Sequence, residues 1–235
     1  MKNFTTPKTA HHIVRDIIVS EGNIDDLNNS KSSDLHFIKC NFSGAILKNI
    51  TMTNSIFEDC DFRGTTLEHS NLDNCHWLRC KGHQLSLSYA NCIENFIESC
   101  DFSGSKWFGT KLAHTKFKAS KLLGANFLDS RAMGVKFEEC NLTSATLRQF
   151  SFRNQIVSAL NFTEADLGGC DFRDTEFEDC KLTGASMKDA NFKGADLRHA
   201  DLGLVDMRDA SNFRGAIISK SQASDLLKAY GMLVM

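Results

Sequence analysis

Residues 161–205 read NFTEA DLGGC DFRDT EFEDC KLTGA SMKDA NFKGA DLRHA DLGLV, a run that repeats every five residues. The second position of each pentad is bulky and apolar, and the last position is mostly small. A period of five is neither the 3.6 of a helix nor the 2 of a flat strand, so the chain must turn a regular corner after each short extended piece. Self-similarity at a fixed period predicts a solenoid.

The same register extends from Phe37 to Met207 without a slip, which predicts a single repeat domain. We assign residues 35–218 to this domain. Residues 1–34 lie before it and are expected to cap its open end, because terminal repeats need protection from edge-to-edge association. Residues 219–235 form a C-terminal helix and tail.

Cysteines indicate the size of one coil. Eight of the nine occupy the small position two residues before an apolar centre, and Cys92 is itself a centre. Free cysteine behaves as a small buried hydrophobe, so we expect core packing and no metal, cofactor or redox site. Six of the eight fall at multiples of twenty, which predicts four pentads per coil and about nine coils: Cys40, Cys60, Cys80, Cys100, Cys140 and Cys180.

Neighbouring coils are then expected about 4.8 Å apart, the usual spacing of paired strands. This spacing exceeds the roughly 3.8 Å between the Cβ atoms of a disulfide. The stacked thiols should therefore be reduced.

The register ends after Met207, because Phe213 follows where a centre at 212 would be expected. The segment 219–231 then predicts a helix with Ser219 as its N-cap and Gly231 at its C-terminal stop. One face of this helix is apolar, and it must pack either on the last coil or on a second copy of the chain. This face comprises Ala223, Leu226, Leu227 and Tyr230.

Bulk composition excludes several classes of protein. The formal net charge of −2 gives no basic field for nucleic acid. The sequence has no apolar run long enough to cross a membrane, and its start lacks the apolar core of a signal peptide, which favours the cytoplasm. The histidines are scattered and no nucleophile elbow or phosphate loop occurs, so we do not expect an enzyme.

The motif A-[D/N]-[L/F]-x-x is typical of the pentapeptide-repeat family, which this chain resembles over about three quarters of its length. It occurs literally at four places: Ala165-Asp166-Leu167, Ala190-Asn191-Phe192, Ala195-Asp196-Leu197 and Ala200-Asp201-Leu202. The resemblance implies a right-handed, four-sided β-helix, in agreement with the coil size inferred from the cysteines. Fold alone does not imply function.

Two further segments resemble the quinolone-resistance (Qnr) members of the family. They are Gln222-Ala223-Ser224 with Leu226-Leu227, and Leu87-Ser88-Tyr89-Ala90-Asn91 with Trp107 and Gly109. The resemblance implies a bacterial protein that binds DNA gyrase and topoisomerase IV through a DNA-like surface, dimerises through its C-terminal helix, and gives quinolone or toxin resistance. Loops that interrupt the repeat in many Qnr proteins have no counterpart here, which puts drug protection in doubt.

Charge is uneven along the repeat. Residues 106–136 carry seven bases against Asp129, whereas residues 164–209 carry twelve acids and six bases. The outward-pointing acidic residues at 164–209 form either a surface that mimics DNA phosphates or a set of simply solvated side chains. The candidate surface comprises Asp166, Asp171, Glu176, Asp196, Asp201 and Asp206.

Four apolar residues should also point outward, in the position after a centre. They are either a docking patch for a partner or lie beneath the N-terminal segment. These residues are Phe108, Leu123, Leu128 and Met133. The leading hypothesis is a cytoplasmic, dimeric binder of a type II topoisomerase, and the alternative is a non-catalytic interaction scaffold or secreted effector that docks through this patch.

Overall fold

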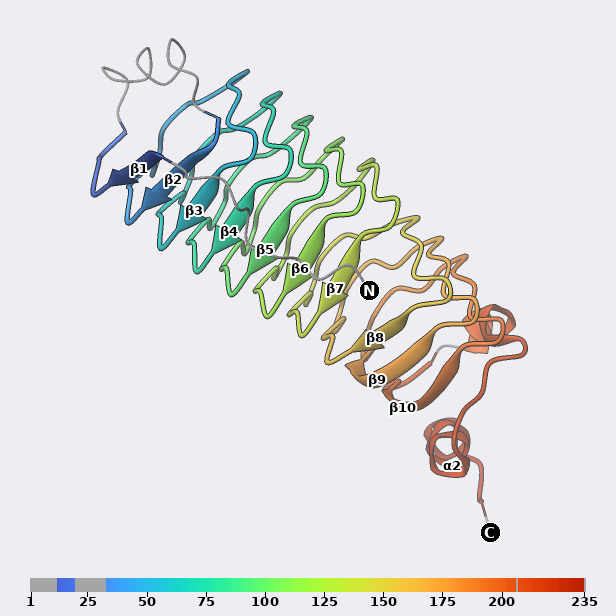
Figure 1. The fold of residues 1–235 in the computed structure, drawn as a ribbon. Coiled ribbons are helices and arrows are strands. Elements are labelled where there is room, and N and C mark those ends of the chain that lie inside the picture. The colour runs from blue at the N-terminus through green and yellow to red at the C-terminus, as the bar shows by residue number, and fades with distance from the viewer. Residues whose placement is uncertain (1–11, 20–32, 206, 235) are drawn as a thin grey trace.

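The computed structural model describes residues 12–19, 33–205 and 207–234. In this part of the protein the chain forms a rod of stacked coils, with β1 (His12–Arg15) at one end and α2 (Lys220–Ala229) at the other (Figure 1). The stack has about nine coils, which confirms the predicted β-solenoid with a short C-terminal helix.

Parallel backbone pairing joins each coil to the next with a register of twenty residues. Phe37 pairs with Phe57, and Phe57 pairs with Trp77. Isolated bridges repeat the same step on the other sides, as between Thr66 and Ser86. The four-pentad coil predicted from the cysteine positions is therefore confirmed.

The strands are short because each coil must turn every five residues. Seven lie in one parallel sheet and three in a second one. The first sheet contains β1 (His12–Arg15), β2 (Leu35–Ile38), β3 (Ile56–Glu58), β4 (His76–Leu78), β5 (Phe96–Glu98), β6 (Lys116–Lys118) and β7 (Lys136–Glu138). The second contains β8 (Ile156–Ser158), β9 (Glu176–Lys181) and β10 (Asp196–Asp201).

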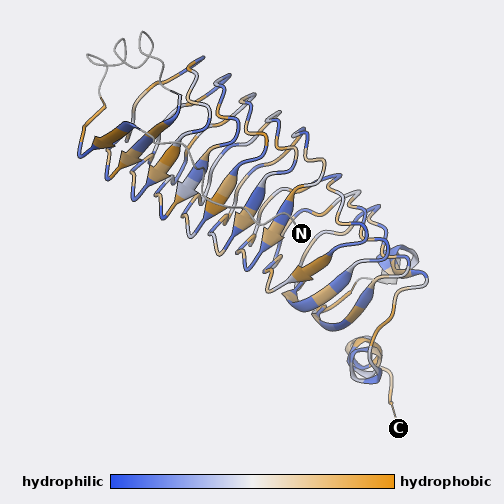
Figure 2. Cartoon of the chain, in the orientation of Figure 1, coloured by the Kyte–Doolittle hydropathy of each residue, from blue (hydrophilic) through white to orange (hydrophobic). Residues whose placement is uncertain are grey.

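Corners are two-residue turns whose second residue has a positive φ angle. Glycine adopts this conformation without a steric penalty, as at Gly44 with φ 70°, and Asn54 takes the same position with φ 56°. At the remaining positions successive side chains point alternately into and out of the rod, with the apolar centres inside and polar residues outside. Hydrophobic (orange) and hydrophilic (blue) residues therefore alternate along the coils (Figure 2). The regular corner predicted from the period of five is confirmed.

Aromatic rings stack along the rod axis because residues twenty apart lie above one another. Phe37 and Phe57 stack with centroids 5.3 Å apart, and Phe42 and Phe62 with centroids 4.5 Å apart. All four rings are fully buried. Each buried phenylalanine contributes about 1.5–3 kcal/mol, so these stacks are a major source of stability.

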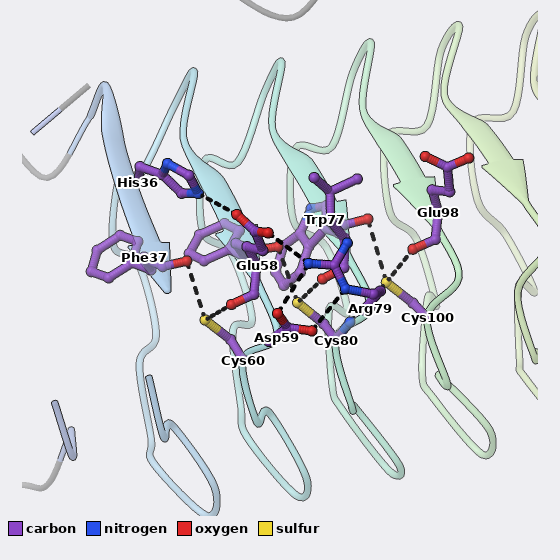
Figure 3. A network of polar contacts seen from close by, with 12 residues as sticks. His36, Phe37, Glu58, Asp59, Cys60, Trp77, Arg79, Cys80, Glu98 and Cys100 are labelled. Carbon is purple, nitrogen blue, oxygen red and sulfur yellow. Dashed lines mark hydrogen bonds and ion pairs between the residues drawn. The ribbon is translucent and has the colours of Figure 1, made fainter. Parts of the chain in front are cut away.

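All nine cysteines are free and buried. Thiols in the small position donate weak hydrogen bonds to the carbonyl of a centre in the preceding coil, as from Cys80 to Phe57 at 3.2 Å and from Cys100 to Trp77 at 3.4 Å (Figure 3). Burial disfavours the thiolate and raises the pKa of Cys140 and of Cys180 to about 11.

The two ends of the rod differ. At the N-terminal end β1 pairs in parallel with β2 and adds a strand to the stack; the rest of the proposed cap, residues 1–11 and 20–32, lies outside the described residues. At the C-terminal end the chain forms a short 3-10 helix, η1 (Met207–Phe213), and then α2. Phe213 stacks on Phe192 with centroids 4.6 Å apart and so occupies the place of the next centre despite the slip in register.

The helix begins as predicted. The Ser219 side chain accepts a hydrogen bond from the Gln222 amide, and the Gln222 side chain accepts one from the Ser219 amide, which makes a complete capping box. The Gln222 Nε2 group also donates to the carbonyl oxygens of Leu197 and Ala200, at 2.8 and 2.7 Å. These bonds satisfy two carbonyls of the last coil that would otherwise lack a partner.

The buried thiols predict a loss of stability in alkali. Between pH 9.0, the ordinary thiol pKa, and about pH 11 the unfolded chain loses thiol protons that the folded chain retains. The free energy of unfolding should therefore fall in this range, by about 1.4 kcal/mol per pH unit for each such thiol. Urea denaturation at pH 8 and pH 10 measures the fall.

Replacing Cys140 and Cys180 by serine supplies the matched control, since serine occupies the same position at Ser105 and Ser120 and does not titrate in this range. The double variant should lose less stability between pH 8 and pH 10 than the unaltered protein. An identical fall in both proteins would show that these thiols do not control the pH dependence.

Candidate functional site

Surface residues are arranged in columns because the coil contains twenty residues. We name the four faces by their centres. The strand face has centres every twentieth residue from Phe37, the second face from Phe42, the third from Leu47 and the fourth from Met52. Two residues that differ by twenty are direct neighbours, whereas two that differ by five lie on adjacent faces.

The candidate acidic residues are divided among all four faces. Asp166 lies on the third face, Asp171 on the fourth and Asp201 on the second, and Asp206 lies outside the described residues. Glu176 and Asp196 alone are direct neighbours, paired between β9 and β10 on the strand face. A continuous acidic surface made from all six residues therefore does not form.

Arginines two residues further along the chain, or in the preceding coil, neutralise several of these carboxylates. Asp171 pairs with Arg173 at 2.7 Å and Asp166 with Arg148 at 3.3 Å. Arg198 lies 2.6 Å from Asp196 and lowers the pKa of that carboxyl to about 2. Counting charges along the sequence could not reveal this pairing.

An acidic cluster remains on the strand face at the C-terminal end. It consists of Glu176, Glu178 and Asp179 of β9 with Asp196 of β10. The three residues of β9 are exposed and take part in no ion pair within the described part of the chain. Glu176 lies directly opposite Asp196, and Arg198 compensates the charge of Asp196. The outward carboxylates of β9 remain open to a cationic partner.

The other end of the strand face is electrically balanced. Arg79 contacts Glu58 at 2.6 Å and Asp59 at 2.9 Å, and His36 contacts the second oxygen of Glu58 at 2.9 Å (Figure 3). The arginine holds the pKa of both carboxyls below their usual range. Each carboxylate here has its counter-ion, in contrast to β9.

The fourth face, which adjoins the strand face, is basic over the same half of the rod. One of its columns contains Arg153, Arg173 and Lys193, and Arg131 lies in a second column. Asp171 and Asp174 compensate part of this charge. The rod thus presents opposite charges on two adjacent faces, a segregation that appears only when the sequence is divided into columns of twenty.

The four residues of the candidate docking patch lie on three different corners. Phe108 and Leu128 are neighbours in one column, while Leu123 and Met133 lie at the corners on either side of it. Phe108 packs edge-on against Tyr89 with ring centroids 5.3 Å apart. Leu128 and Met133 line one depression of the fourth face, which Leu123 does not reach.

The apolar face of α2 is divided between the rod and solvent. Leu226 packs against the core, and the Tyr230 hydroxyl donates a hydrogen bond to the carbonyl of Val205. Ala223 is half-buried, whereas Leu227 is 39% exposed. Ile218, which precedes the helix, and Leu233, which follows it, are also exposed. The helix therefore covers the last coil and still presents apolar side chains outward.

Neither a metal site nor a membrane helix is found where the structure describes the chain. No three His, Cys, Asp or Glu side chains gather there as metal ligands. None of the described helices is long and apolar enough to span a bilayer.

Solved structures of other repeat proteins resemble this rod. Full-length QnrB1, a plasmid-mediated fluoroquinolone resistance protein, is 18% identical with a TM-score of 0.46, covering 95% of this chain and 100% of its own. HetL from the cyanobacterium Nostoc, involved in heterocyst differentiation regulation, is 16% identical with a TM-score of 0.46, covering 76% and 93%. A pentapeptide repeat protein of the Arabidopsis thaliana thylakoid lumen is 20% identical with a TM-score of 0.21, covering 61% and 84%.

No curated protein matches the sequence. Two family models do. The pentapeptide repeat region model matches residues 50–127, and the model of eight pentapeptide repeats matches residues 110–149 and, in overlapping segments, 161–225. The matched residues make up more than half of the chain and follow the register that the backbone pairing shows. The chain therefore belongs to the pentapeptide-repeat family.

Proposed function

We propose that this protein is a non-catalytic, cytoplasmic binder of a bacterial type II topoisomerase, and that the acidic cluster of β9 and β10 is its contact surface. The single observation that supports the proposal is the exposed set Glu176, Glu178 and Asp179, which forms no ion pair with a described residue and lies next to Asp196. A topoisomerase recognises the phosphates of DNA largely through lysine and arginine side chains. Carboxylates held on a rigid rod offer such a surface a substitute for phosphate.

The geometry limits this mimicry to one side of the rod. The strand face is acidic at its C-terminal end, but the adjoining fourth face carries Arg153, Arg173 and Lys193. A basic enzyme surface would be repelled by that face. The rod should therefore engage its partner along the strand face.

Dimerisation through α2 would extend the contact surface. The helix follows the coil that contains β10, and Gln222 bonds directly to that coil. A second copy joined at Leu227 and Leu233 would therefore bring a second acidic cluster to the same end. The resemblance of this segment to Qnr proteins supports the same arrangement.

Charge reversal tests the contact surface. We expect the purified protein to alter DNA supercoiling by gyrase, and the triple variant Glu176→Lys, Glu178→Lys and Asp179→Lys to weaken this effect at least tenfold, because it presents cations to a basic surface. Titration in a gyrase supercoiling assay measures both.

The matched control reverses Glu164, Asp174 and Asp189, three exposed acids on other faces, and so changes the net charge equally. This control should act like the unaltered protein. An equal effect of the two triple variants would exclude the acidic cluster as the contact.

Adding ciprofloxacin to the supercoiling assay distinguishes protection of gyrase, in which supercoiling is rescued, from inhibition of gyrase. No effect of the unaltered protein at micromolar concentration would favour the interaction scaffold.

Substitutions in α2 test the dimer. Leu227→Arg places a charge at an exposed apolar site and should produce monomers that remain folded. Asp225→Arg, two residues away on another side of the helix, should remain dimeric. Light scattering gives the masses, and a Leu227→Arg protein with the mass of the unaltered dimer would show that the interface lies elsewhere.

A further inference from the structure

The backbone ladder is interrupted between the coils that contain Ala132 and Phe150. In the preceding coil the amides of Leu112 and His114 donate to Arg131 and Met133, both at 2.9 Å. One coil later Ala132 and Gly134 are the corresponding donors. Neither of their amides makes a backbone hydrogen bond to the next coil within the described part of the chain.

The interruption continues onto the strand face. In the next coil the amides of Asp171 and Glu176 each donate a hydrogen bond to a carbonyl of the preceding coil. The corresponding amides of Ser151 and Ile156 donate to no backbone carbonyl of a described residue. The strands β7 and β8 consequently belong to different sheets, and the gap between them is visible in the ribbon (Figure 1). Pairing resumes at Glu139, whose amide bonds to the carbonyl of Ser158.

A mismatch of side-chain volume explains the interruption. Phe150 occupies the position two before a centre, which elsewhere in the repeat contains no other aromatic residue and is mostly Cys, Ala, Ser or Thr. Its ring is buried and lies 5.8 Å from Phe127 and 6.2 Å from Phe137, measured between centroids. The undersized centre Ala132 leaves room for part of this ring. The remainder holds the two coils apart.

A second undersized centre does not open the ladder. Gly82 is followed by Leu85 in the small position of the same coil, and an added Cβ at Gly82 would lie 2.6 Å from the ring of Phe102. Phe102 and Leu85 thus fill that space. The ladder stays closed there, with the Gly82 amide 2.7 Å from the carbonyl oxygen of Asp101.

The opened coils form a groove on the fourth face. Leu128, Ala132, Met133 and Phe150 give it an apolar lining. Met133 is 72% exposed, an unusual state for so large an apolar side chain. The Ser130 hydroxyl, which also lines the groove, is buried and has no hydrogen-bond partner in the described structure. An unsatisfied hydroxyl beside unpaired amides can bond to a ligand that enters the groove.

Arginines lie along the rim of the groove. Arg148 lines it directly, and Arg131 and Arg153 are the exposed neighbours of Ala132 and of Phe152. Arg148 pairs with Asp166 at 3.3 Å and Arg153 with Asp174 at 3.8 Å, whereas Arg131 forms no ion pair with a described residue. Asp129 is the one carboxylate among the lining residues. The exposed Arg131 therefore offers charge complementarity to an anionic occupant.

We propose that this groove binds an extended acidic peptide segment that inserts an apolar side chain. The apolar anchor would cover Met133 and Leu128, the acidic residues would meet the arginines, and the peptide backbone would pair with the unpaired amides of Ala132 and Ser151. Pairing of an extended segment with free backbone groups is an established mode of recognition. The groove lies on the basic face, so this site is separate from the acidic cluster of β9 and β10.

Binding of designed peptides tests the groove. The probe is a fluorescein-labelled peptide in which Leu and Phe are flanked by Glu and Asp, and the comparison peptide has Lys at each acidic position. Fluorescence anisotropy should show at least tenfold tighter binding of the acidic peptide. Equal binding of both peptides, or binding of neither, would overturn the proposal, and so would an oligothymidylate that binds more tightly than the acidic peptide.

Point variants locate the site. Met133→Asp and Arg131→Glu should each weaken binding of the acidic peptide at least tenfold. The matched control is Leu123→Asp, which places the same charge at another outward apolar residue on a different corner, 46% exposed, and should leave binding unchanged. An equal loss in Leu123→Asp and Met133→Asp would overturn the proposal.

A paired substitution closes the groove without adding charge. Ala132→Leu with Phe150→Ala restores the usual pattern of a large centre and a small position, and should complete the ladder and raise the melting temperature. The closed variant should lose peptide binding at least tenfold while its circular dichroism spectrum stays unchanged. A closed variant that melts higher and binds the peptide as well as the unaltered protein would overturn the proposal.

Discussion

The parallel backbone hydrogen bond between coils is the interaction on which the rest of this structure depends. The amide of one residue donates to the carbonyl nineteen residues later, as from Phe62 to Lys81 at 2.6 Å or from Leu122 to Asn141 at 2.8 Å, and these bonds satisfy backbone groups that would otherwise be buried without partners. The stacks of phenylalanine and the columns of cysteine follow from the same register. Side chains must fit the resulting spacing of about 4.8 Å, so one oversized residue is enough to open the ladder.

The register also determines the surface chemistry. Each outward position becomes a column, so a charge acts on its neighbours twenty residues away as well as on those beside it in sequence. Arg79 meets Asp59 in this way, and Glu176 meets Asp196. Opposite charges on the strand face and the fourth face arise from this arrangement, although the chain as a whole carries only −2. A rod of this kind can offer different partners different faces.

Much of the fold could be predicted from the sequence because the five-residue pentad and the twenty-residue coil both appear as regular spacings of residues. The pentad gave the corners, the cysteines at multiples of twenty gave the coil size, and Ser219 and Gly231 marked the ends of the helix. The candidate site was less predictable. Counting acids along the chain missed the pairing of Asp171 with Arg173, and the opening at Ala132 depends on Phe150, a residue of the next coil. The relation between Ala132 and Phe150 spans two coils and so has no signature within a single pentad.

Amide hydrogen exchange resolved to single residues tests most directly whether the backbone ladder opens between the coils of Ala132 and Phe150. Exchange reports the loss of backbone hydrogen bonds amide by amide. We predict that Ala132, Gly134, Ser151 and Ile156 exchange faster, on the order of a hundredfold, than their counterparts one coil away, such as Leu112, His114, Asp171 and Glu176. Uniformly slow exchange across both sets would contradict it, because the ladder would then be closed and the groove absent.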